Sequence, residues 1–340
     1  MSIAQYAPTV ISARRARSAK VLVILVLVCL AGFAATLVLG TTVVPIPEVI
    51  QALSGNGGAT FTVLELRLPR AVLGVLTGAA FGMSGAVFQS LLRNPLASPD
   101  IIGISAGASA AAAFGIVVLG ASGTVVSLLA LIGACATAAA IALLAAGPGS
   151  ATARMILVGI GAAAILKSLL TLVLSRASTW DLQGAMQWLA GSLNGAAWEQ
   201  ILPLALTCLV VVPMLLLGTR SLAVLRLGDD AAMGLGVRPA ATRWALMLLA
   251  VVLLAAGTAA AGPIAFVAFL AGPVAARLHG GGTAPLVSSA LVGSALVLWA
   301  DLVGQLAFAH RYPVGVITGA IGAPVLIALL VGAGKRRGQR

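Results

Sequence analysis

Charged residues are scarce in this sequence. Only 8% of the 340 residues are Asp, Glu, Lys or Arg, whereas 61% are hydrophobic and the mean hydropathy is +1.13. A typical water-soluble protein carries about a quarter charged residues. A chain this apolar, with so few charged residues, would not be soluble in water. The composition therefore excludes a soluble globular fold and indicates a membrane protein.

Cysteine and histidine are rare as well. The three cysteines, Cys29, Cys135 and Cys208, all lie inside apolar runs, where we interpret them as small hydrophobic residues without a disulfide role. The two histidines, His279 and His310, offer no metal-ligand cluster together with them. We therefore expect neither a metal site nor another cofactor.

A phosphate-binding loop is also missing. The one Gly–Lys pair, Gly334–Lys335, is followed by Arg336 and lacks the glycine pattern that precedes the lysine of such a loop. The chain is therefore not expected to be an enzyme that hydrolyses ATP.

Long apolar runs make up most of the chain instead. Unbroken runs of this length predict membrane-spanning α-helices, because the strands of a membrane barrel alternate apolar and polar residues. The first run is long enough to span and shows no obvious small-residue cleavage site, so we expect a helix there rather than a signal peptide. The predicted fold class is an all-α polytopic membrane protein with about ten spans, at residues 21–40, 70–92, 100–119, 124–146, 154–175, 198–217, 240–261, 264–278, 284–303 and 314–333.

Glycine and proline mark two of these spans. In the second span Gly74, Gly78 and Gly82 recur every four residues, which places them on one helix face where another backbone can approach closely. The eighth span is short, and Gly–Pro pairs at 262–263 and 272–273 interrupt it. That pattern predicts a broken or partial helix lining a pathway.

The distribution of Lys and Arg predicts the orientation. With the N-terminus placed inside, fifteen of the 20 basic residues fall in internal segments and Lys167 falls within a span. Four fall outside, namely Arg67, Arg70, Arg176 and Arg311. Because basic residues concentrate on the cytoplasmic side, both termini are expected in the cytoplasm. The chain then divides into a cytoplasmic tail at 1–20, one transmembrane domain at 21–334 and a basic cytoplasmic tail at 335–340.

Two connections are expected to carry surface helices. The external connection 41–66 contains the stretch P-I-P-E-V-I-Q-A-L, which could form a short amphipathic helix on the outer surface. The internal loop 220–239 alternates charged and apolar residues at helical spacing. Asp229 and Asp230 argue against simple binding to anionic lipid, so this loop is a candidate for docking a partner.

Two serine motifs favour a different class of function, an intramembrane or hydrolytic enzyme. Ser84 lies in a G-x-S-G sequence and Ser105 in a G-x-S-x-G sequence. A catalytic serine needs a base within hydrogen-bond reach, and both histidines lie near span ends on opposite sides of the predicted topology. With 40 glycines in the chain, such triplets also arise as helix-packing residues.

An ion-coupled secondary carrier is the other alternative. Such carriers need ionisable groups at mid-membrane depth. Only Lys167 is clearly placed within a span, whereas Asp301 lies near a span end. Lys167 could also extend to the membrane surface or pair with a backbone carbonyl.

Residues 67–108, from R-L-P-R through Q-S-L-L-R-N-P-L-A-S-P-D to G-I-S-A-G-A, resemble the signature of the permeases of iron-siderophore and cobalamin ABC importers. Three further stretches match in order: L-G-D-D-A-A-M-G-L-G-V at 227–237, G-P-I-A-F-V-A-F-L-A-G-P-V-A-A-R at 262–277, and A-D-L-V-G-Q at 300–305 with P-V-G-V-I-T-G-A-I-G-A-P at 313–324. The resemblance covers nearly all of the chain after residue 40.

The resemblance implies a type II importer permease fold with ten helices per subunit. It also implies a second permease subunit, identical or homologous, two cytoplasmic ATP-hydrolysing subunits and an extracytoplasmic substrate-binding protein. The expected function is import of ferric siderophore across the cytoplasmic membrane of a bacterium. Cobalamin or haem import within the same family is the alternative, and the stretches F-V-A-F-L-A-G-P and H-R-Y-P-V-G-V favour the siderophore branch.

The resemblance also implies three sets of site residues. Arg67 and Arg70 would dock the binding protein, with Arg311 in place of a third family arginine that is Gln305 here. The cytoplasmic gate would consist of Asn94, Leu96, Thr152 and Ala153. The coupling contact with the ATPase would lie in loop 220–239, at Leu227, Gly228, Asp229, Asp230, Met233, Gly234, Leu235 and Gly236.

Overall fold

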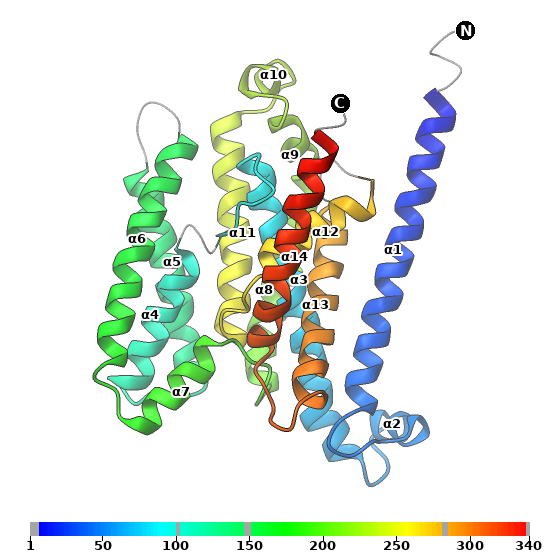
Figure 1. Ribbon diagram of the computed structural model, residues 1–340, viewed down its shortest axis with the longest axis vertical. Coiled ribbons are helices and arrows are strands. Elements are labelled where there is room, and N and C mark those ends of the chain that lie inside the picture. The colour runs from blue at the N-terminus through cyan, green and yellow to red at the C-terminus, as the bar shows by residue number, and fades with distance from the viewer. Residues whose placement is uncertain (1–6, 100–102, 146–150, 281–284, 338–340) are drawn as a thin grey trace.

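The structure, a computed structural model, describes residues 7–99, 103–145, 151–280 and 285–337. Within these ranges helices are the only regular secondary structure, joined by turns and loops, with no strand (Figure 1). The predicted fold class is thus confirmed.

A helix stands at each of the ten predicted spans, with ends that differ by a few residues. Seven of the described helices are long and apolar enough to cross a membrane: α1 (Ala7–Val38), α3 (Leu68–Leu91, continued from a π-helical turn at Thr62–Arg67), α5 (Thr124–Leu144), α6 (Ala151–Leu174), α8 (Trp198–Leu217), α11 (Pro239–Ala261) and α13 (Leu286–Leu306). The remaining three are α4 (Ile104–Val117), α12 (Val267–Leu278) and α14 (Val314–Arg337). Helix α1 begins well inside the segment predicted as a tail.

Short helices mark the two ends of the bundle. At one end lie α9 (Thr219–Leu225) and α10 (Asp229–Gly234), together with the start of α1 and the end of α14 (Figure 1). We call this the α10 end. At the other, the α2 end, lie α2 (Ile46–Leu53) and α7 (Thr179–Leu189). The helix predicted on the outer surface is α2, and it buries Val49 and Ala52 while leaving Ile46 and Ile50 exposed.

Helix α7 was not predicted. It lies in a segment that the sequence analysis treats as an external loop. The local signal is present, because the Ser178 hydroxyl accepts a hydrogen bond from the Asp181 amide at 3.2 Å, as an N-cap residue does.

The glycine face of α3 packs directly on the backbone of α13. A Cβ added at Gly78 would overlap backbone atoms of Gly293 and Ser294, and one added at Gly82 would overlap the carbonyl oxygen of Ser289. The predicted close approach is confirmed, and its partner is α13. We call this contact the α3–α13 seam. One turn further, a Cβ at Gly85 would overlap the backbone of Ala268 in α12.

Helices α4 and α12 both begin inside the bundle. Gly103, just before α4, has φ +91° and lies against Gly159 and Ala163 of α6, more than one turn from either end of that helix. Phe266, just before α12, has φ +64°, an uncommon conformation for a residue with a side chain. The chain therefore turns sharply before α12, as predicted for the first Gly–Pro pair. The second pair does not interrupt the span, because α12 continues through Gly272 and Pro273.

Candidate functional site

The loop predicted as the coupling contact forms a projection at the α10 end. Its turns depend on glycine, because Gly228 has φ +117° and Gly236 has φ +79°. Buried Leu222, Leu225 and Ala232 anchor the projection to the rest of the protein.

Three large apolar side chains of this projection face outward. Leu227 is 68% exposed, Met233 57% and Leu235 62%. We call these three residues the apolar tip. Leu222 and Leu225 of the same loop are buried and are not part of this tip. Gly234 lies beside the tip, and no atom stands within 4 Å of the position that its Cβ would occupy.

Asp229 links this projection to the body of the bundle. Arg243 of α11 donates two hydrogen bonds to its carboxylate, at 3.0 and 2.6 Å, and Arg93 lies 3.7 Å from the same group. The hydrogen bonds from Arg243 lower the pKa of Asp229 below its ordinary value, and the charge of Arg93 adds to the effect. The carboxylate is therefore ionised at neutral pH, and this link is lost only as the pH falls through the lowered pKa.

Arg93 connects the same projection to the hairpin that follows α3. Its guanidinium also donates a hydrogen bond to the carbonyl oxygen of Leu225 at 2.7 Å, and its own φ is +51°. A cavity of about 150 Å³ lies between the hairpin, Arg226 and α12. The hairpin that carries the candidate gate residues is thus in direct contact with the projection through Arg93, which the sequence analysis did not predict.

The gate residues of the hairpin are exposed. Asn94 accepts a hydrogen bond from the Leu96 amide at 2.9 Å through its side-chain oxygen, so it shapes the turn around Pro95. The Leu96 side chain is 37% exposed. Thr152 and Ala153 belong to the first turn of α6, but their side chains lie outside the described part of the structure.

The two arginines at the start of α3 have partners within the protein. Arg67 is buried, and its guanidinium donates hydrogen bonds to the carbonyl oxygens of Leu37, Val38 and Thr42 at 2.6–2.8 Å. It thereby satisfies carbonyls at the C-terminal end of α1 that no helical amide can reach. These hydrogen bonds give Arg67 a structural role, in addition to any part in docking the binding protein.

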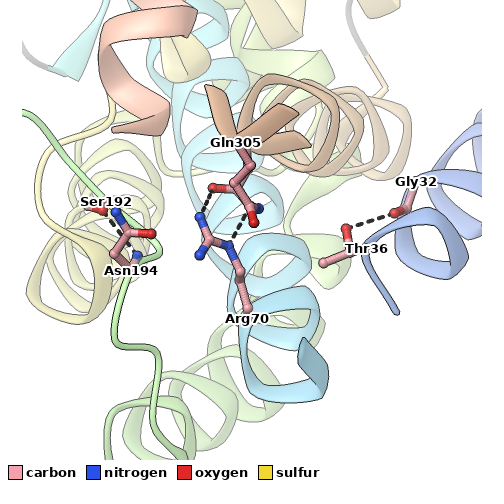
Figure 2. Close-up of polar contacts among 7 residues, drawn as sticks. Gly32, Thr36, Arg70, Ser192, Asn194 and Gln305 are labelled. Carbon is pink, nitrogen blue, oxygen red and sulfur yellow. Dashed lines mark hydrogen bonds and ion pairs between the residues drawn. The ribbon is translucent and has the colours of Figure 1, made fainter. Parts of the chain in front are cut away.

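Arg70 forms a bidentate ion pair with Asp301 of α13, at 2.7 and 2.8 Å. Gln305 donates a third hydrogen bond to the same carboxylate at 2.7 Å, and Figure 2 shows Gln305 and Arg70 on facing sides of this contact. Asp301 is almost fully buried, so this network fixes α3 against α13 at the α2 end. Arg311, by contrast, is exposed, and it has no ion pair within the described residues.

The first serine motif lacks the surroundings of a nucleophile. Ser84 is fully buried and donates a hydrogen bond to the carbonyl oxygen of Ala250 at 2.7 Å. His279 contacts Ala275 and Ser288 instead, at the end of α12. Among the described residues, no group of three His, Cys, Asp or Glu could hold a metal ion.

Comparison with known proteins finds similarity over most of the chain. Residues 23–332 match the FecCD transport family. The chain is 39% identical over 301 residues to the ferric enterobactin transport system permease protein FepG of Escherichia coli, covering 88% of this chain and 91% of that one. It is 40% identical over 311 residues to the achromobactin transport system permease protein CbrC of Dickeya dadantii, covering 90% and 89%.

The fold also matches a solved structure. A structure described as an inward-facing conformation of a metal-chelate type ABC transporter superposes with a TM-score of 0.83 at 26% identity. The match covers 92% of this chain and 99% of that chain.

Proposed function

Because this chain belongs to the FecCD transport family, we propose that it is the permease subunit that carries ferric siderophores through an ATP-driven importer of the bacterial cytoplasmic membrane. The names of two relatives support the substrate class, since one transports ferric enterobactin and the other achromobactin. The observation that carries the proposal is the apolar tip at the α10 end. A permease without a phosphate-binding loop needs such a contact to receive work from a separate ATPase.

The assembly that we propose contains a second permease subunit, two cytoplasmic ATP-hydrolysing subunits and an extracytoplasmic binding protein. The α10 end faces the cytoplasm in this arrangement, and both termini lie there. The described basic residues support that orientation, because those at the α10 end outnumber those at the α2 end.

Uptake tests the function directly. A strain that lacks this chain should take up little radiolabelled iron from its ferric siderophore, and expression of the chain should restore uptake. Uptake should stop when ATP is depleted and persist when the proton gradient alone is dissipated. Uptake that follows the proton gradient instead would favour the ion-coupled carrier.

The binding protein is proposed to dock on the α2 end. Of the predicted residues, Arg311 is exposed, whereas Arg67 is buried against backbone carbonyls and Arg70 is paired with Asp301. Exposed charges at the rim of an interface influence association rate and salt sensitivity. Arg311→Glu should therefore weaken docking about tenfold at low salt. Arg176→Glu, at another exposed position of the same end, should not, and equal binding by both variants would contradict this role.

The gate is proposed to close at the hairpin of Asn94 and Leu96, together with Thr152 and Ala153. The exposure of Leu96 and the contact of Arg93 with the projection support this assignment. Cysteines introduced at Leu96 and Thr152 should form a disulfide across the two permease subunits in one nucleotide state only. A disulfide that forms equally with and without ATP would exclude a gating role.

A further inference from the structure

Lys167 is a charged residue on a helix that is otherwise suited to lipid. It lies about 10 Å from the Leu174 end of α6 and about 24 Å from the Ala151 end, at a rise of 1.5 Å per residue. The helix satisfies the length and hydropathy of a membrane span. Its side chain is exposed, and within the described residues it makes no hydrogen bond or ion pair.

A lysine ammonium inside a membrane span is costly. Such residues face a bundle interior or a water-filled cavity, or extend to the membrane surface. Which of these applies to Lys167 depends on the surface next to it.

Lys167 lines a cavity of about 440 Å³ between α6, the start of α4 and the turn before α12. The side chains of Ser98, Ser105 and Ser109 line the cavity together with the aromatic rings of Phe266 and Phe269. No Asp or Glu occurs among its described lining residues. The only described formal charge in the cavity wall is therefore positive.

We infer that Lys167 is a binding residue for the anionic oxygens of the chelate as it crosses the membrane, and that it makes the pathway selective for negatively charged ferric chelates. This inference rests on the proposed function and adds the charge class of the substrate. A positive group lowers the electrostatic cost of an anion in a low-dielectric pathway. The serine hydroxyls and the aromatic rings supply neutral contacts for the rest of the chelate.

The inference separates two chemical classes of siderophore. Trivalent iron bound by three catecholate groups forms a trianion, and hydroxycarboxylate chelates such as ferric citrate are also anionic. Iron bound by three hydroxamate groups forms a neutral complex. An ammonium in the pathway favours the first class, because only that class presents net negative charge to it.

Transport by the intact importer, purified with its partner subunits and reconstituted in proteoliposomes, tests this role. Ferric citrate or a ferric catecholate serves as the anionic substrate, and a ferric hydroxamate as the neutral one. Lys167→Met should lower transport of the anionic chelate about tenfold, the loss of one charge-assisted contact of about 1.4 kcal/mol. It should leave transport of the neutral chelate unchanged, or raise it. Lys167→Arg should keep the preference for the anion.

The neighbouring Leu169→Met is the matched control, because Leu169 is exposed on the same helix but does not line the cavity. Two results would overturn the inference: an equal loss for both chelates, which would assign Lys167 a structural role, or no loss for either, as expected if the ammonium extends to the membrane surface. A wild-type importer that transports no ferric chelate would contradict the proposed function itself, and is thus distinguishable from both.

Discussion

Replacing Gly234 with tryptophan should strongly reduce ferric siderophore uptake while leaving the permease folded. No atom lies within 4 Å of the position of a Cβ at Gly234, so the indole can extend outward without displacing any part of this chain. It would then lie between the apolar tip and the ATPase surface that we propose to cover it. Since a few central contacts dominate the affinity of an interface, disrupting this one should reduce uptake on the order of a hundredfold.

Ala240→Trp is the matched control for this substitution. Ala240 is exposed on the first turn of α11, at the same end of the molecule but outside the α9–α10 projection. Co-purification of the ATPase and substrate-stimulated ATP hydrolysis should be lost in the first variant and retained in the second. Wild-type values of both in Gly234→Trp would show that work enters the permease elsewhere.

Reversing the charge of Asp229 would not test the ATPase contact alone. Asp229 holds Arg243 and lies beside Arg93, so its reversal also breaks contacts within the permease. Asp230 is exposed and has no ion pair within the described residues, so Asp230→Arg changes the outer surface alone. The single variant Asp230→Arg is therefore the better probe of the ATPase contact.

Replacing Gly82 with alanine should destabilise the permease more than any other single methyl group added at its predicted glycine face. The new Cβ would overlap the carbonyl oxygen of Ser289, which is part of the α13 backbone and cannot rotate away. Overpacking of this kind costs about 1–3 kcal/mol, and Gly82→Leu should prevent recovery of folded permease altogether. The thermal midpoint of aggregation in detergent measures the effect.

Gly161→Ala provides the comparison. Gly161 lies in α6, where a Cβ would meet no atom within 4 Å, so the substitution should be neutral or slightly stabilising in a helix. If Gly82→Ala and Gly161→Ala have the same thermal midpoint, the α3–α13 seam is not as tight as its geometry indicates.

Properties that depend on local pattern were predictable from the sequence. The apolar runs located the ten spans, the four-residue spacing of Gly74, Gly78 and Gly82 identified a close-packing face, and amphipathic spacing located α2. These features depend on residues close together in the chain. The period of a helix converts their spacing directly into a face.

Pairings between distant residues were not predictable in the same way. Arg70 and Asp301 are 231 positions apart, and 132 positions separate Arg93 from Leu225. From its charge and its position at a span end, Arg70 was a candidate for contact with a partner protein, because no residue nearby in the sequence places a carboxylate beside it. The signal that could have identified the pair is the presence of Asp301 near the end of a span on the same side as Arg70, where a buried charge requires a counter-ion.

The α3–α13 seam also limits how the protein can move. Side chains at most helix interfaces can change rotamer and allow one helix to slide past the other by small shear. At Gly78 and Gly82 backbone lies against backbone, and the Arg70–Asp301 pair holds the same two helices near the α2 end. No side chains lie at these two backbone contacts that could rearrange, so we expect α3 and α13 to move together as one rigid unit. Opening and closing would then need hinges elsewhere. The turns at Gly103, before α4, and at Phe266, before α12 and in the wall of the cavity that Lys167 lines, are the candidates.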